Sequence, residues 1–317
     1  MPATHMRRVQ LGQQSAFTTP VTATSLLRGV TDGSVQIQHS DSVVQELGRN
    51  VSTLPVISQR YGEGEIELAT TYEDILYALF GLFGPVAPSG NPPARVFNGP
   101  VSSFAAPQIY TVEYGTSGAE YRMVGAIIRD WTLRYEANAN VTETWGLIGR
   151  NVQANGMASP TLRTVHPVLS RHATFYVDAL GTPHGTTAIA GTAISFEMTI
   201  ETNRHLKMFE DSNPLGWGEG RWNATMTIVA EFNAIAKAWV DALINSNVAR
   251  NIRAEFIETA NTREIQIDFV GMLTNAVELF SDRDGNMTVE LEFSAIVGAP
   301  LSNWFSARVV NGVATLP

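Results

Sequence analysis

The chain presents one order of local sequence patterns twice, and this repetition limits the folds available to it. Residues 61–84 read YGEGEIELATTYEDILYALFGLFG, in which a Gly-Glu-Gly turn precedes an alternating polar and apolar run and then an apolar-striped segment. Residues 217–245, WGEGRWNATMTIVAEFNAIAKAWVDALIN, repeat this order, with Gly218 following Gly62 by 218 − 62 = 156 positions. In a chain of 317 residues, such a repeat predicts two similar domains.

Each copy of the repeat contains one predicted helix of about three turns. In the first copy Thr71 can cap the helix, Glu73 and Asp74 suit its positive end, and Gly84 ends it. Apolar residues then recur on one helical face in both copies, at Ile75, Leu76, Leu79, Phe80 and Phe83, and at Ile235, Ala236, Trp239, Val240, Leu243 and Ile244. We therefore expect one helix with a single buried face in each half.

Most of the remaining chain alternates with period two. Residues 193–201 (AISFEMTIE), 263–269 (REIQIDF) and 288–294 (TVELEFS) place apolar side chains on one face and polar side chains on the other. The first half contains comparable runs at 109–115 and 121–128. Alternation over this length is typical of antiparallel strands that have one buried and one wet face. The chain is therefore predicted to be mainly β.

The spacing of the repeat suggests the domain plan. Val124-Gly125 matches Val270-Gly271 at 270 − 124 = 146 positions, ten fewer than the Gly-Glu-Gly pair, and a Pro/Gly-rich insert at 84–100 accounts for the difference. We expect an N-terminal arm, a first β domain, a linker, a second β domain and a C-terminal tail, at 1–32, 33–153, 154–164, 165–298 and 299–317.

Charge and motifs exclude several functions. Thirty acidic residues against 21 basic ones give a net charge of −9, which does not suit a protein that grips phosphates. The sequence has no cysteine, no apolar signal region and no run of about 18 apolar residues, so we expect a soluble, intracellular chain without a membrane segment. It has no nucleophile motif, histidine pair of metal-ligand spacing or phosphate cradle. We therefore expect no enzyme activity, no metal and no cofactor.

Two long segments are predicted to be loops that dock against another surface. They span residues 39–61 and 202–217. Loops of this length in a compact domain are usually functional or disordered, and these two contain apolar residues, which favours docking. The candidate contact residues are Val43, Val44, Leu54, Val56, Ile57, Leu206, Met208 and Phe209.

Acidic residues recur on the polar faces of the predicted strands. Glu290 and Glu292 stand two apart, and the pattern returns in two other strands, so a charged surface explains them better than a catalytic carboxylate pair. The candidate acidic face consists of Glu264, Asp268, Glu290, Glu292, Glu197 and Glu201.

The N-terminal sequence LGQQSAFTTPVTATSLLRG (11–29) resembles the opening arm of tail tube proteins (major tail proteins) of long non-contractile-tailed bacteriophages. The order of strand, long loop, strand, amphipathic helix and further strands is also similar. The resemblance implies two tandem β-sandwich or β-barrel domains, each with one flanking helix, plus extended arms and long loops. Two such domains in one chain imply trimeric rings with pseudo-sixfold symmetry, as in the duplicated form of the family.

The resemblance further implies a structural virion protein that is assembled in the host cytoplasm. Its partners would be other copies of itself, the tape measure protein, and the tail terminator or tail-tip proteins. Stacked rings would form a hollow tube, and the acidic face would line the lumen and let DNA slide without being held. Two alternatives remain at this point: another tail part (a terminator or a baseplate hub), and a carbohydrate-binding β-sandwich module.

Overall fold

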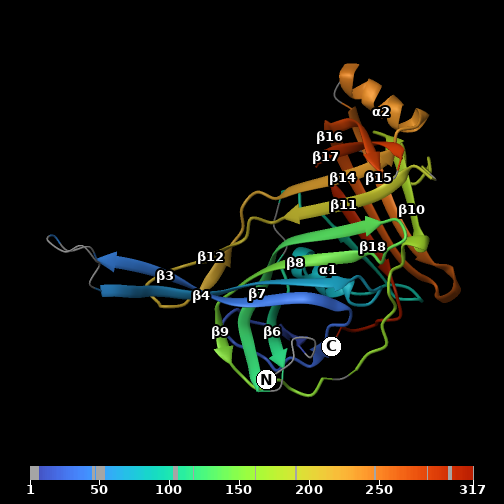
Figure 1. Ribbon diagram of the computed structural model, residues 1–317. Helices are drawn as coiled ribbons and strands as arrows, with labels where there is room; N and C mark the ends of the chain where they lie inside the picture. Colours follow the sequence, from blue (N-terminus) through green and yellow to red (C-terminus); the bar gives the residue numbers. More distant parts are fainter. Residues whose placement is uncertain are drawn as a thin grey trace.

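The structure is a computed structural model that describes residues 7–44, 47, 54–102, 106–116, 118–160, 162–189, 191–245, 248–283, 285–298 and 302–316. Antiparallel strands dominate these residues, together with two α-helices, α1 (Ile75–Phe83) and α2 (Ala234–Asn245). The prediction of a mainly β fold with one helix in each half is confirmed (Figure 1).

The first half consists of two groups of strands that share the long strand β7 (Ala119–Glu136). The C-terminal part of β7 lies beside β8 (Thr142–Gly149), followed by β4 (Leu54–Ala69) and β3 (Val30–Val44). Its N-terminal part pairs with β6 (Ile109–Thr116) and β9 (Asn151–Ala154), and β6 continues to β1 (Arg8–Gln14) and β2 (Ser25–Leu26). Core side chains come from both groups, including Ile66, Val112, Met123 and Trp145.

The second half has the same arrangement around the long strand β16 (Arg263–Arg283). Its C-terminal part lies beside β17 (Asn286–Ala295), followed by β14 (Asn223–Glu231) and β11 (Ala193–Glu201). Its N-terminal part pairs with β15 (Val248–Glu258) and β18 (Phe305–Val310), and β15 continues to β10 (Ala173–Ala179). Strands β3, β4, β6, β7, β8 and β9 thus match β11, β14, β15, β16, β17 and β18.

Backbone hydrogen bonds outside the strand ladders recur at matching places in the two halves. In the first half, the amide of Arg150 donates to the carbonyl of Val124; in the second, the amide of Ile296 donates to that of Val270. Likewise, the amide of Thr70 donates to the carbonyl of Val141, and that of Phe232 donates to the carbonyl of Met287. Val124 and Val270 therefore match as the sequence predicted. The two Gly-Glu-Gly triplets do not match, because the first lies inside β4 and the second ends in the loop before β14.

The two halves are joined at two places. Residues 130–136 of β7 pair antiparallel with residues 195–201 of β11, so one sheet runs through both halves. The insert at 84–100 contains β5 (Ala94–Asn98), which pairs with β18 of the second half. The guanidinium group of Arg95 also donates to the carbonyls of Val313 and Ala314, at 2.7 and 2.8 Å.

The segments predicted to be an arm and a tail are parts of the sheet. Val9 and Leu11 of β1 are each 1% exposed, and Phe305 and Ala307 of β18 are buried. The prediction failed for β1 because the residues between its apolar positions are glutamines. Gln10 and Gln14 are buried and hydrogen-bonded, so a polar pattern here does not indicate an exposed segment.

The two helices differ in burial: the expectation of one buried face holds for α2, although Ile235 and Ile244 of that predicted face are exposed, and it is wrong for α1. All nine residues of α1 are buried, and Gly81 packs so closely on β7 that an added Cβ would lie 2.5 Å from Ile128 Cδ1. Helix α2 buries Ala236, Trp239 and Val240, whereas Ile244 is 73% exposed. The segments that surround α1 are distant in sequence, so its own periodicity does not reveal them.

The predicted loop at 39–61 is instead a long hairpin. Strands β3 and β4 stay paired out to Val44 and Leu54, and the hairpin projects from the body of the molecule (Figure 1). The predicted loop at 202–217 contains a short pair of strands, β12 (His205–Lys207) and β13 (Gly216–Gly218). We name residues 202–222, which connect β11 to β14, the excursion.

Candidate assembly surface

One continuous polar face spans eight strands from both halves. The strands lie in the order β3, β4, β8, β7, β11, β14, β17 and β16. Along each strand, apolar side chains point into the core and polar ones lie on the opposite face, as in β11, where Phe196 and Met198 are buried. At the junction of the halves, Thr132 and Thr199 form a hydrogen bond of 3.1 Å between their hydroxyl groups. We name this surface the polar face.

Acidic side chains are the main charged groups of the polar face. They are Asp32, Glu63, Glu65, Glu67, Asp130, Glu136, Glu197, Glu201, Glu231, Glu290 and Glu292. The arginines that contact them are Arg7, Arg129, Arg134 and Arg283, for example Arg134 Nε at 2.8 Å from Glu197 Oε2. Because acidic groups outnumber these arginines, the polar face presents a negative potential.

Four of the six candidate acidic residues lie together on the polar face. Glu197 and Glu201 stand on β11, and Glu290 and Glu292 stand on β17, two strands away. Glu264 and Asp268 do not join them, because they belong to the part of β16 that pairs with β15 and β18. Their partners there are basic: Glu264 forms an ion pair with Arg308, and Asp268 with Arg253.

The acidic residues that the first half contributes were expected as counterparts of those in the second half, but they could not be named from the sequence. Glu63, Glu65 and Glu67 alternate with Ile66, Leu68 and two glycines along β4, and this alternation was present in the run GEGEIELA. Because glycine has no side chain, the run has few apolar positions and its periodicity is weak. Gly62 and Gly64 lie on the core side, close to Met123.

The candidate contact residues fall in the hairpin and in the excursion. Val43, Val44, Leu54, Val56 and Ile57 belong to β3 and β4, and their side chains lie outside the described part of the structure. In the excursion, Leu206 and Met208 are half-buried, and Phe209 is exposed.

No group of three or more His, Asp or Glu in the described ranges could hold a metal ion. A family model for phage tail tube proteins matches residues 7–295, which is most of the chain.

The chain belongs to the phage tail tube protein family.

Membership confirms the resemblance seen in the sequence. This tail tube protein is therefore a structural virion component of a family that self-assembles into a tube. No curated protein matches the sequence. Among the described residues, no helix is long and apolar enough to span a membrane.

The polar face of this tail tube protein ends in two open edges. At one end, β3 pairs with β4 alone in the described structure, and at the other end residues 275–283 of β16 pair with β17 alone. Unpaired edges of this kind present free backbone donors and acceptors, which favour the addition of a further strand.

A buried ion pair anchors the excursion to the first half of this tail tube protein. The side chain of Arg204 is 0% exposed and lies 3.3 Å from Glu219 (Nε to Oε1). The Arg204 guanidinium donates to the carbonyls of Gly81 and Leu82, at the end of α1, and of Ile128 on β7. Burial lowers the pKa of Arg204 to about 10, although Glu219 opposes this shift. The excursion is therefore fixed to α1 rather than free.

Proposed function

We propose that three copies of this protein close a ring and that stacked rings form the hollow tail tube of a long non-contractile tail, through which DNA passes during ejection. The observation that carries the proposal is the junction between β7 and β11 inside the chain. The two open edges, β16 and β3, are the strands that match β7 and β11.

Ring closure would repeat the internal junction between neighbouring copies. If β16 of one copy pairs with β3 of the next as β7 pairs with β11, each copy adds two equivalent units. Such a contact joins different faces of neighbouring copies, and contacts of this kind form closed rings when the rotation between units fits. Three copies would supply six units with pseudo-sixfold symmetry.

The two halves are proposed to derive from one duplicated tail-tube unit. The matching strand order and the matching hydrogen bonds support this origin. The units correspond to the domains expected at 33–153 and 165–298, joined by the linker at 154–164, and each also takes in a strand from outside those bounds, β1 and β18.

We assign the polar face to the lumen of the tube. A conduit for DNA must not hold it, and affinity for the DNA backbone comes mainly from basic groups that neutralise phosphates. An acidic, sheet-wide surface with few arginines meets this need. The tape measure protein, the tail terminator and the tail-tip proteins are its proposed partners, and assembly takes place in the host cytoplasm.

Negative-stain electron microscopy, together with the solution mass of the purified protein, tests the ring. We expect hollow rings or tubes whose mass is a multiple of three chains of 34.5 kDa. Single particles of one chain at every concentration and salt would contradict self-assembly of this chain. Rings of six chains would contradict the pseudo-sixfold trimer.

Charge reversal tests the assignment of the lumen. The triple variant Glu201→Lys, Glu290→Lys and Glu292→Lys should assemble normally, but phage that carry it should eject DNA about tenfold more slowly at low salt, because each lysine can pair with a phosphate. Asp241→Lys, on the exposed side of α2, is the control and should leave ejection unchanged. Normal ejection by the triple variant would place these residues outside the lumen.

A further inference from the structure

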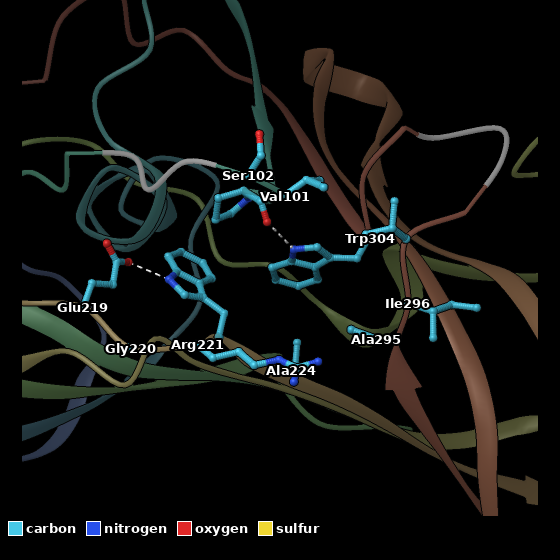
Figure 2. A pocket seen from close by; sticks show the side chains of 12 residues that line it. Val101, Ser102, Glu219, Gly220, Arg221, Ala224, Ala295, Ile296 and Trp304 are labelled. Carbon is cyan, nitrogen blue, oxygen red and sulfur yellow. Dashed lines mark hydrogen bonds between the residues drawn. The ribbon is translucent and has the colours of Figure 1, made fainter.

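The two halves each have a groove at the same place in the fold. The first-half groove is lined by Ile37, Gln59, Arg60, Tyr61, Asn151 and Val152, together with Ser212 and Asn213 of the excursion. The second-half groove measures about 700 Å³, and its lining includes Val101, Trp222, Ala295, Ile296, Val297 and Trp304 (Figure 2).

In the first half, the groove holds part of the second half. The amide of Arg60 donates to the carbonyl of Ser212 at 2.7 Å, and Arg150 Nε donates to the carbonyl of Pro214 at 3.1 Å. The excursion of the second half therefore docks beside β4 and at the end of β8.

The same two positions of the second half lie in the second-half groove. Ile296 matches Arg150, since their amides make the same hydrogen bond to Val270 and Val124. Phe232 and Thr70 match, because their amides make equivalent hydrogen bonds. Counting back the same number of residues from each leads to Trp222 and Arg60, which therefore match as well. Residues 219–222, at the end of the excursion, line this second groove themselves, and no residue from the described part of the hairpin is among its lining residues.

The second-half groove combines aromatic and apolar side chains with the polar side chains of Ser102, Glu219 and Arg221. Trp222 and Trp304 lie edge to face with 6.1 Å between their ring centroids. Each indole is held in place, by Trp222 Nε1 donating to Glu219 and Trp304 Nε1 donating to the carbonyl of Pro100 (Figure 2). Val101 and Val297 are 55% and 56% exposed at its rim, so the groove presents apolar surface that a partner would cover.

We propose that this groove receives the β3–β4 hairpin of the neighbouring copy in the same ring. The hairpin connects β3 to β4 as the excursion connects β11 to β14, so it is the counterpart of the segment that fills the first-half groove. The inference rests on the proposed ring, in which the second half of each copy lies beside the first half of the next copy. Each ring then has six equivalent docking contacts, three within chains and three between them.

The sequence of the hairpin suits the groove that would receive it. The hairpin contains four apolar residues, Val43, Val44, Leu54 and Val56. The groove likewise contains the apolar residues Trp222 and Ile296. The first-half contact consists of hydrogen bonds, since the Arg60 backbone amide and the Arg150 side chain donate to backbone carbonyls there. An apolar contact between copies can form from two separately folded surfaces, because burial of apolar area drives association.

Cysteine cross-linking tests this contact, and the chain offers a background without native cysteine. Val297→Cys is combined in turn with Val43→Cys, Val44→Cys and Leu54→Cys, and the assembled protein is oxidised and run on a denaturing gel. We expect disulfide-linked species that stop at three chains, because contacts within a trimeric ring close on themselves. The control combines Ile244→Cys, on the exposed side of α2, with the same hairpin cysteines and should give no linked chains.

The outcomes separate this inference from the ring itself. Ladders that continue beyond three chains would mean that the hairpin reaches a stacked ring, and they would overturn the inference. Intact rings without linked chains in all three variants would overturn it as well, while the proposed function stands. Absence of rings in the unmodified protein would remove both. As a second measurement, Val101→Glu with Val297→Asp should raise the concentration for half-assembly at least tenfold, and unchanged assembly would count against the groove.

Discussion

Replacing Ile37 with proline is expected to leave the chain folded and to abolish its assembly into rings. The hydroxyl of Tyr114 donates to the carbonyl of Gly33 at 2.5 Å, so the backbone groups of Gly33 point away from β4. Neighbours in an antiparallel strand alternate in direction, so Val35 and Ile37 also direct their backbone groups to the open edge. A proline at such a position removes a donor that β4 does not use.

The internal junction indicates what the lost donor would bind. Ile37 pairs with Gly62, and Ile200 pairs with Ala224 at the matching place in the second half, so Ile37 matches Ile200. Across the internal junction, Ile200 pairs with Trp131. The residue of β16 that matches Trp131 is Ala276, which pairs with Leu291 as Trp131 pairs with Trp145. In the ring, Ile37 would therefore pair with Ala276 of the next copy. Proline would break this ladder and place its own ring against the approaching strand.

Sedimentation and circular dichroism measure the two parts of this prediction. The Ile37→Pro variant should sediment as a single chain of 34.5 kDa at concentrations where the unmodified protein forms rings, with an unchanged far-ultraviolet spectrum. Ile37→Val, which keeps the backbone donor, is the matched control and should assemble normally. Rings of normal mass formed by the proline variant would show that β3 is not the joining edge.

The unfolding free energy is expected to fall as pH rises from about 5 to 8, largely because of one buried carboxyl group. Glu143 lies inside the first half, where Oε2 accepts hydrogen bonds from Trp131 Nε1 and Trp145 Nε1, at 2.8 and 2.9 Å. Oε1 is buried and has no hydrogen-bond partner among the described residues. Burial raises the pKa of Glu143 from 4.5 to about 7, although the two indole donors oppose the shift.

The sign of the effect follows from proton binding in the two states. Between pH 4.5 and 7 the folded chain holds a proton on Glu143 that the unfolded chain has released, so raising the pH favours unfolding. The contribution is fully present below pH 4.5 and lost as pH rises through 7. A shift of this size corresponds to roughly 3 kcal/mol.

Urea unfolding of the unmodified protein and of Glu143→Gln, at pH 5 and pH 8, isolates this contribution. The unmodified protein should lose about 3 kcal/mol more than the variant between these two pH values, because glutamine does not titrate. Other titrating groups change both proteins alike, and a concentration with one sedimenting species avoids any contribution from assembly. Equal losses in the two proteins would show that Glu143 does not change protonation in this range.

The sequence allowed the fold class and part of the candidate surface to be predicted. Period-two alternation placed Glu197, Glu201, Glu290 and Glu292 on wet strand faces, and the structure brings the two strands that carry them into one sheet. Glu264 and Asp268 alternate just as regularly. However, they lie in the part of β16 that pairs with β15, whereas the C-terminal part of the same strand pairs with β17 on the polar face, and alternation alone cannot reveal this change of partner. Pairing partners are a property of the whole chain, and local periodicity does not contain them.

The burial of α1 and the extent of the β3–β4 hairpin could not be predicted for related reasons. The helix is covered by segments far away in sequence, among them Arg204 and Phe305, whose packing depends on the tertiary fold. Around residue 40 the sequence QIQHSDS (36–42) is mostly polar and lacks apolar alternation, so the sequence alone predicts a loop there. Helix α1 lies where the two halves meet, and the hairpin lies where we propose that two copies meet.

Residues 311–316 complete the structure of the N-terminal half, which is synthesised first. Arg95 binds the carbonyls of Val313 and Ala314, the side chain of Gln13 donates to the carbonyl of Leu316, and that of Asn311 donates to the carbonyl of Tyr72. During synthesis, the N-terminal half therefore lacks part of its final structure until residue 316 has left the ribosome. A chain cut short before residue 311 would lack these contacts, so the finished form of the N-terminal half depends on synthesis having passed residue 316.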